Sequence, residues 1–209
     1  MEDETEPLIL DDPGRLKALS HPLRRQILHQ LNTRGPATST TIGAALGANT
    51  GTTSYHLRRL EMYGFIEEIP ERSAGRERWW RRTKGHRDLR MPEPEKLAAE
   101  DRVILTELLR IRHTEDMELL GRLPEAYTQD RAWTMLSRGL THMTQEGLAE
   151  FVEAYLRLLR QHGHRSDDAP PGSRPVHIRL FTLPADEFPA PGSPHSSETS
   201  QDHPGGLLK

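Results

Sequence analysis

Apolar and polar residues in the N-terminal third of the chain alternate with the period of an α-helix. A capping residue and a proline, Asp12 and Pro13, precede a first short helix that continues to Ser20. A second helix starts after His21 and Pro22 and ends at the Gly35-Pro36 break. The apolar positions at helical spacing, which predict the buried faces of these two helices, are Leu16, Leu19, Leu23, Ile27, Leu28 and Leu31.

Two further helices and a hairpin follow. Residues 40–47 predict a third helix capped by Thr38, Ser39 or Thr40, and residues 50–64 predict a fourth that ends at Gly64. The segments 65–69 and 76–83 have strand character and are joined by PERSAG, which predicts a β-hairpin. Thr53, Leu57 and Leu60 share the apolar side of the fourth helix.

The C-terminal half predicts two long helices. Residues 95–122 carry an apolar stripe among charges that requires a partner helix, and Thr144 caps a strongly amphipathic helix that runs to His162. Residues 131–143 are ambiguous between helix and strand, and we expect a short strand near Trp133. Residues 175–184 alternate as a half-buried strand that could pair with it.

These elements predict a mainly α protein with a small β-hairpin, an α+β winged-helix fold. We expect three regions: a winged helix-turn-helix domain at 12–84, a helical region for dimerisation or ligand sensing at 93–183, and a disordered tail at 184–209, which is rich in proline, glycine and serine. The hydrophobic fraction of 34% and aromatic fraction of 5% agree with a chain that is only partly packed.

Charge is distributed very unevenly. Residues 1–14 carry 6 acidic and no basic residues, residues 15–90 carry 15 basic and 6 acidic, and residues 91–209 carry 13 basic and 19 acidic. The net charge of -3 therefore conceals a basic middle segment. A basic segment within an acidic protein is typical of a protein in which one domain binds a polyanion.

Composition removes several classes of function. The chain has no cysteine, which excludes disulfides, thiolate metal sites and cysteine nucleophiles. No apolar run approaches a membrane span and the acidic start lacks a signal peptide's basic region, so we expect a cytoplasmic protein. With no nucleophile elbow, phosphate loop or converging carboxylate pair, we expect neither an enzyme nor a bound cofactor or metal.

The outer side of the fourth helix has the chemistry of a nucleic-acid reader. A helix fits the major groove, where arginine bridges guanine O6 and N7 and hydroxyl groups contact bases or phosphates. We expect Arg59 to be the main base-reading residue. The candidate contacts on this helix are Thr52, Ser54, Tyr55, His56, Arg58 and Arg59.

Arginines of the hairpin favour a different role, contact with the DNA backbone or minor groove that raises affinity more than specificity. The candidates are Arg72, Arg76 and Arg78. For Arg81 and Arg82 two interpretations stay open: DNA contact, or a structural role in which they alternate with Trp79 and Trp80 or pair with Glu67 and Glu68.

Residues 12–84 resemble the ArsR family of bacterial winged-helix regulators. The resemblance rests on ALSHPLRRQIL around the second helix, on IGAALG, and on Ser54, His56, Leu57 and Leu60 within TGTTSYHLRRLEMYGFIEE. It implies a homodimer that binds double-stranded DNA at an inverted repeat, usually as a repressor released by a ligand. The effector, if one exists, would be an unknown small molecule.

The chain departs from the metal-sensing members of that family. It has no cysteine, and His113, Glu115 and Asp116 lie too close in sequence to converge on one helix face; His162 and His164 favour an unliganded surface pair. We expect dimer contacts from residues 95–122 and the first helix, with half-sites about one DNA turn apart.

Two alternatives to a DNA-binding regulator are a winged helix used as a protein-interaction module, whose basic face meets an acidic protein, and an enzyme seated in the C-terminal half, for which no catalytic residue pattern is present. Trp133, Phe151 and Tyr155 could line a ligand pocket, although aromatic residues at this spacing are more often core.

Overall fold

The computed structural model describes residues 8–10, 12–73, 75, 77–83 and 89–185. The chain divides into two units, Met1–Ser137 with His142–Val176, and Arg138–Thr141 with His177–Lys209. All helices and strands described below belong to the first unit. The C-terminal tail predicted from residue 184 lies outside the described residues from residue 186 onward.

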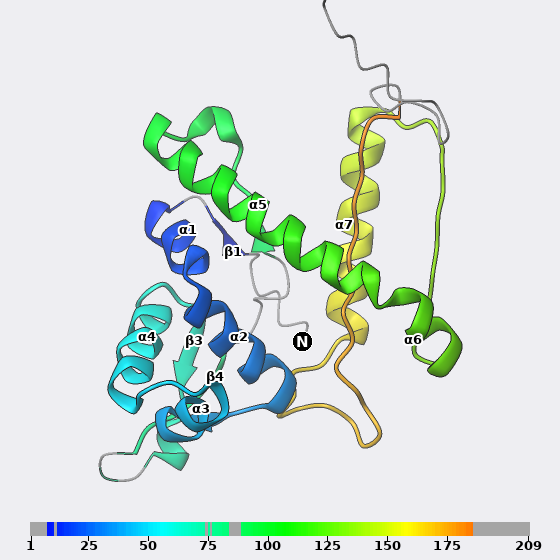
Figure 1. Cartoon of the computed structure of the whole chain (residues 1–209). Coiled ribbons are helices and arrows are strands. Elements are labelled where there is room, and N and C mark those ends of the chain that lie inside the picture. Colours follow the sequence, from blue (N-terminus) through cyan, green and yellow to red (C-terminus); the bar gives the residue numbers. More distant parts are fainter. Residues whose placement is uncertain (1–7, 11, 74, 76, 84–88, 186–209) are drawn as a thin grey trace, which may run out of the picture. The chain divides into compact units, whose positions relative to one another are not determined.

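Four helices form the N-terminal part in the predicted order (Figure 1): α1 Pro13–Ser20, α2 Pro22–Arg34, α3 Ser39–Leu46 and α4 Thr50–Met62. Their starts follow the predicted caps, because Asp12 Oδ1 accepts the Gly14 N–H at 2.7 Å and Thr38 Oγ1 accepts the Thr41 N–H at 3.2 Å. At the other end of α4, Gly64 adopts φ +76°, a conformation that glycine reaches without the steric cost of a side chain.

A three-stranded antiparallel sheet packs beside these helices, in the order β2–β4–β3. The hairpin strands are β3 Ile66–Glu68 and β4 Trp79–Arg82, with a 3-10 turn at Pro70–Arg72 between them. The third strand, β2 Ala37–Thr38, pairs Ala37 with Trp80 and was not predicted. A segment of two residues is too short to show the alternation of apolar and polar residues that predicts a strand. Only the pairing with β4 defines β2.

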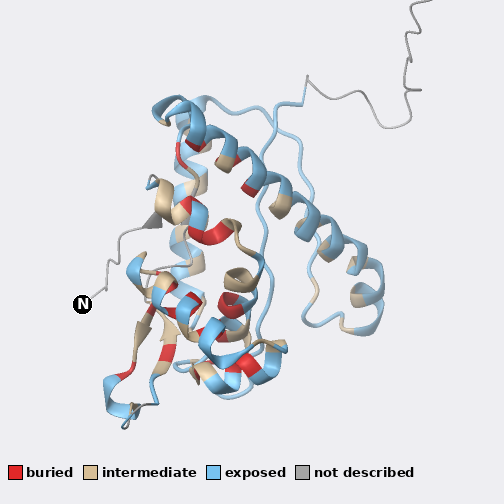
Figure 2. Cartoon of the chain, turned by 60° about the vertical axis from the view of Figure 1, so that its left-hand side comes forward, coloured by how far each residue is buried: buried red, intermediate tan, exposed pale blue. Residues whose placement is uncertain are grey.

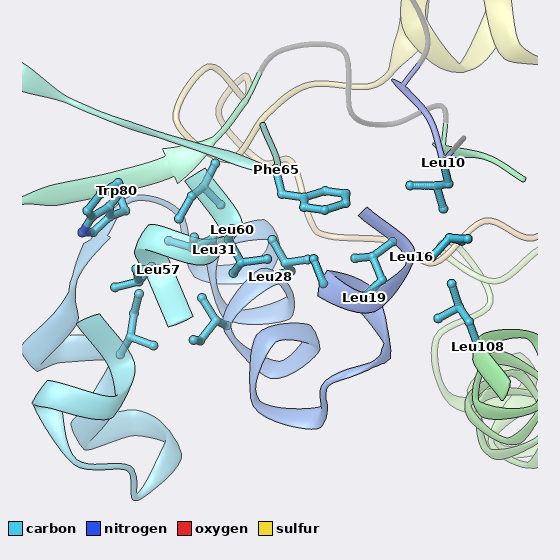
Figure 3. Close-up of a cluster of buried hydrophobic side chains, with 14 of the residues drawn as sticks. Leu10, Leu16, Leu19, Leu28, Leu31, Leu57, Leu60, Phe65, Trp80 and Leu108 are labelled. Atoms are coloured by element: carbon cyan, nitrogen blue, oxygen red, sulfur yellow. The ribbon is translucent and has the colours of Figure 1, made fainter. Parts of the chain in front are cut away.

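Residues before α1 and after the hairpin also meet. β1 Leu8–Ile9 and β5 Leu89–Arg90 form a parallel pair that the sequence did not predict either. The next residue along from β1, Leu10, is fully buried, and Figure 3 shows it beside Leu16 and Leu108. The N-terminal segment therefore closes one end of the core.

The core lies among α1, α2, α3, α4 and the sheet, with two leucines from the long helix α5 Ala99–Gly121 (Figure 3). Figure 2 shows buried positions gathered in the N-terminal helices and the sheet, whereas α5 is exposed along most of its length. α5 packs against α1 through Leu105 and Leu108. The partner helix predicted for residues 95–122 is therefore α1.

The remaining helices are α6 Leu123–Gln129 and α7 Gln145–His162, which Thr144 caps as predicted by accepting the Gly147 N–H at 3.0 Å. The two strands predicted for this half were wrong. Residues 131–133 form a turn, and no strand occurs near Trp133 or at 175–184 in the described part of the chain. Alternation of apolar residues favours a strand only where a neighbour supplies hydrogen bonds, and Val176 and Ile178 are both exposed.

The loop after α7 returns to the N-terminal part. Arg165 forms ion pairs with Asp167 and Asp168 at 3.0 and 2.8 Å and lies 3.8 Å from a carboxylate oxygen of Glu67 on β3. Asp167 also lies 3.7 Å from Arg81 on β4. Ser166 Oγ donates to the Leu31 carbonyl at the end of α2 over 3.4 Å. Residues 163–168 thus attach the end of α7 to the sheet and α2, and we call this segment the α7 loop.

The packing of α5 on α1 gives a matched pair of variants for a stability test. Leu108 is fully buried, whereas its neighbour Leu109 is 47% exposed. We expect Leu108→Ala to lower the free energy of unfolding by about 3 kcal/mol, because it leaves a cavity between the two helices. Leu109→Ala should change it by less than about 1 kcal/mol.

Urea unfolding followed by circular dichroism measures both variants. Equal effects of the two substitutions would contradict the packing described for α5.

Candidate nucleic-acid interface

The connection between α3 and α4 is short and sterically specified. A Cβ on Gly43 would lie 2.8 Å from the Ala48 carbonyl oxygen, so only glycine lets the returning chain pass this close to α3. Asn49 then caps α4, since its Oδ1 accepts the Gly51 N–H at 2.7 Å. This turn fixes α4 against α3 and determines which face of α4 points outward.

α4 has one buried and one exposed side, as predicted. Thr53, Leu57 and Leu60 are fully buried, and the Thr53 hydroxyl donates to the Asn49 carbonyl at 3.1 Å. Thr52 and Arg58 are exposed and Tyr55 is 59% exposed. The exposed side therefore offers hydroxyl groups and a guanidinium over about two turns of helix.

A small polar recess of about 70 Å³ joins α4 to the hairpin. It is lined by residues of α3, α4 and the sheet region: Ser39, Ser54, Arg58, Arg78 and Trp80. The structure thus brings the predicted residues Ser54, Arg58 and Arg78 to one place. The two groups of candidate residues, on the helix and on the hairpin, form one continuous surface at this recess.

Arg59 lies on the opposite flank of the exposed side and is half-buried. Its guanidinium donates to the Tyr63 hydroxyl at 3.3 Å and lies 5.3 Å from the centre of that ring. It also contacts the Met62 sulfur at 3.5 Å. These contacts hold the guanidinium in place, which lowers the entropy cost of presenting it to a ligand.

His56 is where the sequence interpretation was wrong about position. We expected it on the outer side of α4, but it is 6% exposed and its ring lies 4.3 Å from that of His21, at the junction of α1 and α2. Its Nδ1 lies 3.4 Å from the Arg24 guanidinium. At 100° per residue His56 follows Thr53 and precedes Leu60 on the inward side, so the helical period decides its place.

Two arginines of α2 organise this junction, and the sequence analysis did not single them out. Arg24 donates to the Lys17 and Ala18 carbonyls at 2.6 Å each, at the C-terminal end of α1. Arg25 donates to the Ser20 carbonyl at 3.1 Å and forms an ion pair with Glu115 of α5 at 2.8 Å. Two basic residues just after a helix break were the available signal, because cations favour helix C-termini.

Burial lowers the pKa of both histidines at this junction. For His21 desolvation is the largest cause, followed by the positive charges of Arg24 and Arg25. For His56 desolvation again comes first, followed by His21 and Arg24. His21 Nδ1 also accepts the Leu23 N–H at 3.2 Å as the cap of α2, a role that the protonated ring loses.

The hairpin arginines divide between exposed and paired positions. Arg72 is exposed with its guanidinium 5.9 Å from the Trp79 ring centre, and Arg78 lies 3.4 Å from a Glu68 carboxylate oxygen. Arg76 lies outside the described residues.

Of the two arginines of β4, Arg81 pairs with a glutamate of the opposite strand as the structural interpretation predicted, and Arg82 has a backbone partner instead. Arg81 donates to Glu67 at 2.7 Å. Arg82 donates to the Phe65 carbonyl at 3.1 Å, and burial lowers its pKa to about 10, so it stays charged at neutral pH.

The aromatic residues Trp133, Phe151 and Tyr155 line neither of the two hollows described for this chain. Trp133 and Phe151 are 45% and 44% exposed, so these two are not core either. The larger hollow, about 240 Å³, is polar and lies at α6 between Arg122 and Asp130. Within the described ranges no cluster of three or more histidine, aspartate or glutamate side chains is arranged to hold a metal, and no helix is long and apolar enough to cross a membrane.

Three helices in this arrangement, a polar outward face on the last of them and an arginine-bearing hairpin define a winged helix-turn-helix domain, a DNA-binding class. A family model described as "Helix-turn-helix domain" matches residues 19–69. The N-terminal part of the chain therefore carries a helix-turn-helix domain, in agreement with the resemblance of residues 12–84. A helix-turn-helix domain is a DNA-binding domain, which supports a DNA-binding role for this chain.

Solved structures of regulators show limited similarity to the chain. HlyU from Vibrio cholerae is 18% identical over 53% of this chain and 97% of its own, with a TM-score of 0.31. An ArsR family transcriptional regulator is 24% identical over 52% and 88%, with a TM-score of 0.29. The transcriptional regulator Tm0710 from Thermotoga maritima is 14% identical over 71% and 84%, with a TM-score of 0.31.

The comparison with curated proteins finds no match.

The lowered histidine pKa values predict how stability depends on pH. Because the folded pKa lies below the unfolded value of 6.5, the unfolded chain binds protons first as the pH falls. This contribution to stability is complete above the unfolded pKa and is lost as the pH falls through 6.5 toward the folded pKa. We therefore expect the free energy of unfolding to decrease between about pH 7.5 and pH 5.

His56→Gln should flatten that profile, whereas His113→Gln, which alters an exposed side chain on α5, should leave it unchanged. Urea unfolding at a series of pH values measures the effect. An unaltered profile in His56→Gln would show that His56 does not contribute to it.

Proposed function

We propose that the chain is a dimeric transcription repressor that reads a near-palindromic DNA site through α4 and grips the DNA backbone with the hairpin. The single observation that carries this proposal is the continuous surface that joins the exposed side of α4 to Arg78 across the recess. Two copies of α4 on one dimer would meet half-sites about 34 Å apart, on one side of the DNA. The chain acts by binding and not by catalysis.

The residues divide into two roles in this proposal. Thr52, Tyr55 and Arg59 face the base edges, and Arg59 is the main reader because its guanidinium is held by Tyr63 and not by a carboxylate. Ser54, Arg58, Arg72, Arg76 and Arg78 contact phosphates. His56 does not contact DNA in this proposal. It is buried and positions α4.

Release by an unknown small-molecule effector belongs to the same proposal. The junction of α1, α2 and α4 supports such regulation, because Arg24 and Arg25 connect the end of α1 to α4 and to α5 at once. A ligand that shifts α5 would act on α4 through these two side chains.

One observation favours the alternative, a protein-interaction module with an acidic partner. Arg78 lies near Glu68 and Arg81 pairs with Glu67, so part of the hairpin's positive charge is already neutralised within the sheet. A nucleic-acid surface would gain more from free arginines. The experiment below separates the two functions.

Selection of bound sequences from a random double-stranded DNA library tests the proposal. We expect a near-palindromic motif for the unaltered protein. Arg59→Ala should relax one position in each half-site, because a lost bidentate contact costs about 1–3 kcal/mol of discrimination. Arg110→Ala, on an exposed side of α5, is the control and should leave the motif unchanged. Binding without any motif, or no binding, would favour the interaction module.

A second variant tests the hairpin. Arg78→Ala should weaken binding about equally on all sequences and reduce the slope of log affinity against log salt by about one for each hairpin that contacts a phosphate. Titrations at four salt concentrations measure the slope. A changed motif with an unchanged slope would assign Arg78 to base reading instead.

A further inference from the structure

The recess between α3, α4 and the hairpin is lined only by side chains that can donate a hydrogen bond. They are two serines, two arginines and one tryptophan: Ser39, Ser54, Arg58, Arg78 and Trp80. Guanidinium and indole N–H groups donate hydrogen bonds and accept none. No carboxylate is among the lining residues. A recess of this composition suits an anion and not a cation.

Trp80 is the one member of this set that belongs to the core. It is only 3% exposed, yet it lines the recess. Figure 3 shows its indole nitrogen on the side of the ring that points away from Leu31 and Leu60. In the part of the chain that the structure describes, no group accepts a hydrogen bond from this nitrogen. A polar group of a buried side chain normally has a partner, so the indole N–H is placed to donate to a ligand in the recess.

The other donors of the recess are available as well. Among the described residues, the side chains of Ser39, Ser54 and Arg58 have no hydrogen-bond or ion-pair partner. Arg78 lies 3.4 Å from a Glu68 carboxylate oxygen, but its side chain is 54% exposed and has further N–H groups that are free to turn toward the recess. A ligand therefore displaces no hydrogen bond of the domain.

The size of the recess limits what it can hold. Its volume of about 70 Å³ is far below the roughly 300–1,000 Å³ of sites for small organic ligands, so it accommodates one small group and not a metabolite. The guanidinium fork of arginine matches phosphate oxygens. The donors come from α3, α4 and the hairpin, and such a convergent set suits the tetrahedral oxygens of a phosphate better than a planar carboxylate. Ser39 is the first residue of α3, where the helix dipole favours negative charge.

We infer that the recess holds one phosphate group of the DNA backbone, with Ser39 and the indole N–H of Trp80 as donors beside the two arginines. The inference rests on the proposed function and adds these two residues to the phosphate contacts proposed there. Arg58 and Arg78 are exposed, whereas Trp80 is fixed by the core. The fixed donor sets the register of α4 on the DNA backbone, because phosphate contacts position a protein and base contacts specify the sequence.

The indole N–H signals of the three tryptophans give a direct readout by nuclear magnetic resonance. Trp80→Phe and Trp133→Phe each identify one signal by its disappearance. The full-length, ¹⁵N-labelled protein is titrated at low salt with a DNA duplex of random sequence, since phosphate contacts do not depend on sequence. We expect the Trp80 signal to shift until it saturates and the Trp133 signal to stay in place.

Three further titrations identify the source of the anion: inorganic phosphate, sodium chloride at equal ionic strength, and a polyglutamate peptide. A Trp80 shift with the duplex, with or without a shift in inorganic phosphate, supports the inference. A shift with inorganic phosphate and none with the duplex would overturn the assignment to DNA. A shift with polyglutamate and none with the duplex would assign the recess to an acidic protein instead, and a shift with sodium chloride equal to that with the duplex would show a salt effect only. A Trp80 signal that no titrant moves would also overturn the inference.

Affinity for the same duplex tests Ser39 without any change in the core. Ser39→Ala should weaken binding about five- to tenfold, because a hydrogen bond to a charged group is lost. The slope of log affinity against log salt should stay the same, because no charge is removed. Thr128→Ala removes a hydroxyl from an exposed position of α6 and should change neither quantity. Equal affinities of Ser39→Ala and the unaltered protein would overturn the role of Ser39, and circular dichroism checks that each variant is folded.

Failure of this inference and failure of the proposed function have different signatures. A protein that selects a palindromic motif but shows no Trp80 shift on DNA overturns the phosphate site and leaves the regulator intact. A Trp80 shift on the random duplex in a protein that selects no motif supports the phosphate site and overturns sequence reading.

Discussion

The burial of one side of α4 against α2 and the sheet is the constraint on which the exposed polar surface of α4 depends. Leu57 and Leu60 are fully buried in the same cluster as Ile27 and Leu31 of α2 (Figure 3). Burial of this side removes apolar area from water, and the polar side of the helix therefore faces outward. Tyr55 and Arg58 are exposed because Leu57 and Leu60, on the other side of the helix, are buried.

The contacts around α4 also connect it to the rest of the molecule. Arg24 caps the end of α1 and approaches His56 of α4, while Arg25 caps the same end and pairs with Glu115 of α5. At the far side of the domain, the α7 loop attaches the last helix to the strands of the hairpin. The helix α4 and the hairpin are thus each connected to a C-terminal element by side-chain contacts.

Much of the helical structure could be predicted because its signals are local. Caps at Asp12, Thr38 and Thr144, the helical period of Leu57 and Leu60, and the glycine at 64 all act within a few residues. The same period predicted the outward side chains of α4, with His56 as the exception. His56 follows Thr53 by three residues and precedes Leu60 by four, so the helical period itself places it on the inward side, where its ring meets that of His21.

By itself, the sequence determined the order of the helices, the hairpin and the basic surface, since hydrophobic period, capping and charge are properties of neighbouring residues. Only the tertiary structure decided which segments pair over long distances. Strand β2 exists because Trp80 is beside it, the α5 helix is anchored because α1 covers Leu108, and Arg165 finds its carboxylate partner on β3 about one hundred residues away. The expected strand at 175–184 did not form for the converse reason: an alternating pattern becomes a strand only when another strand accepts its hydrogen bonds.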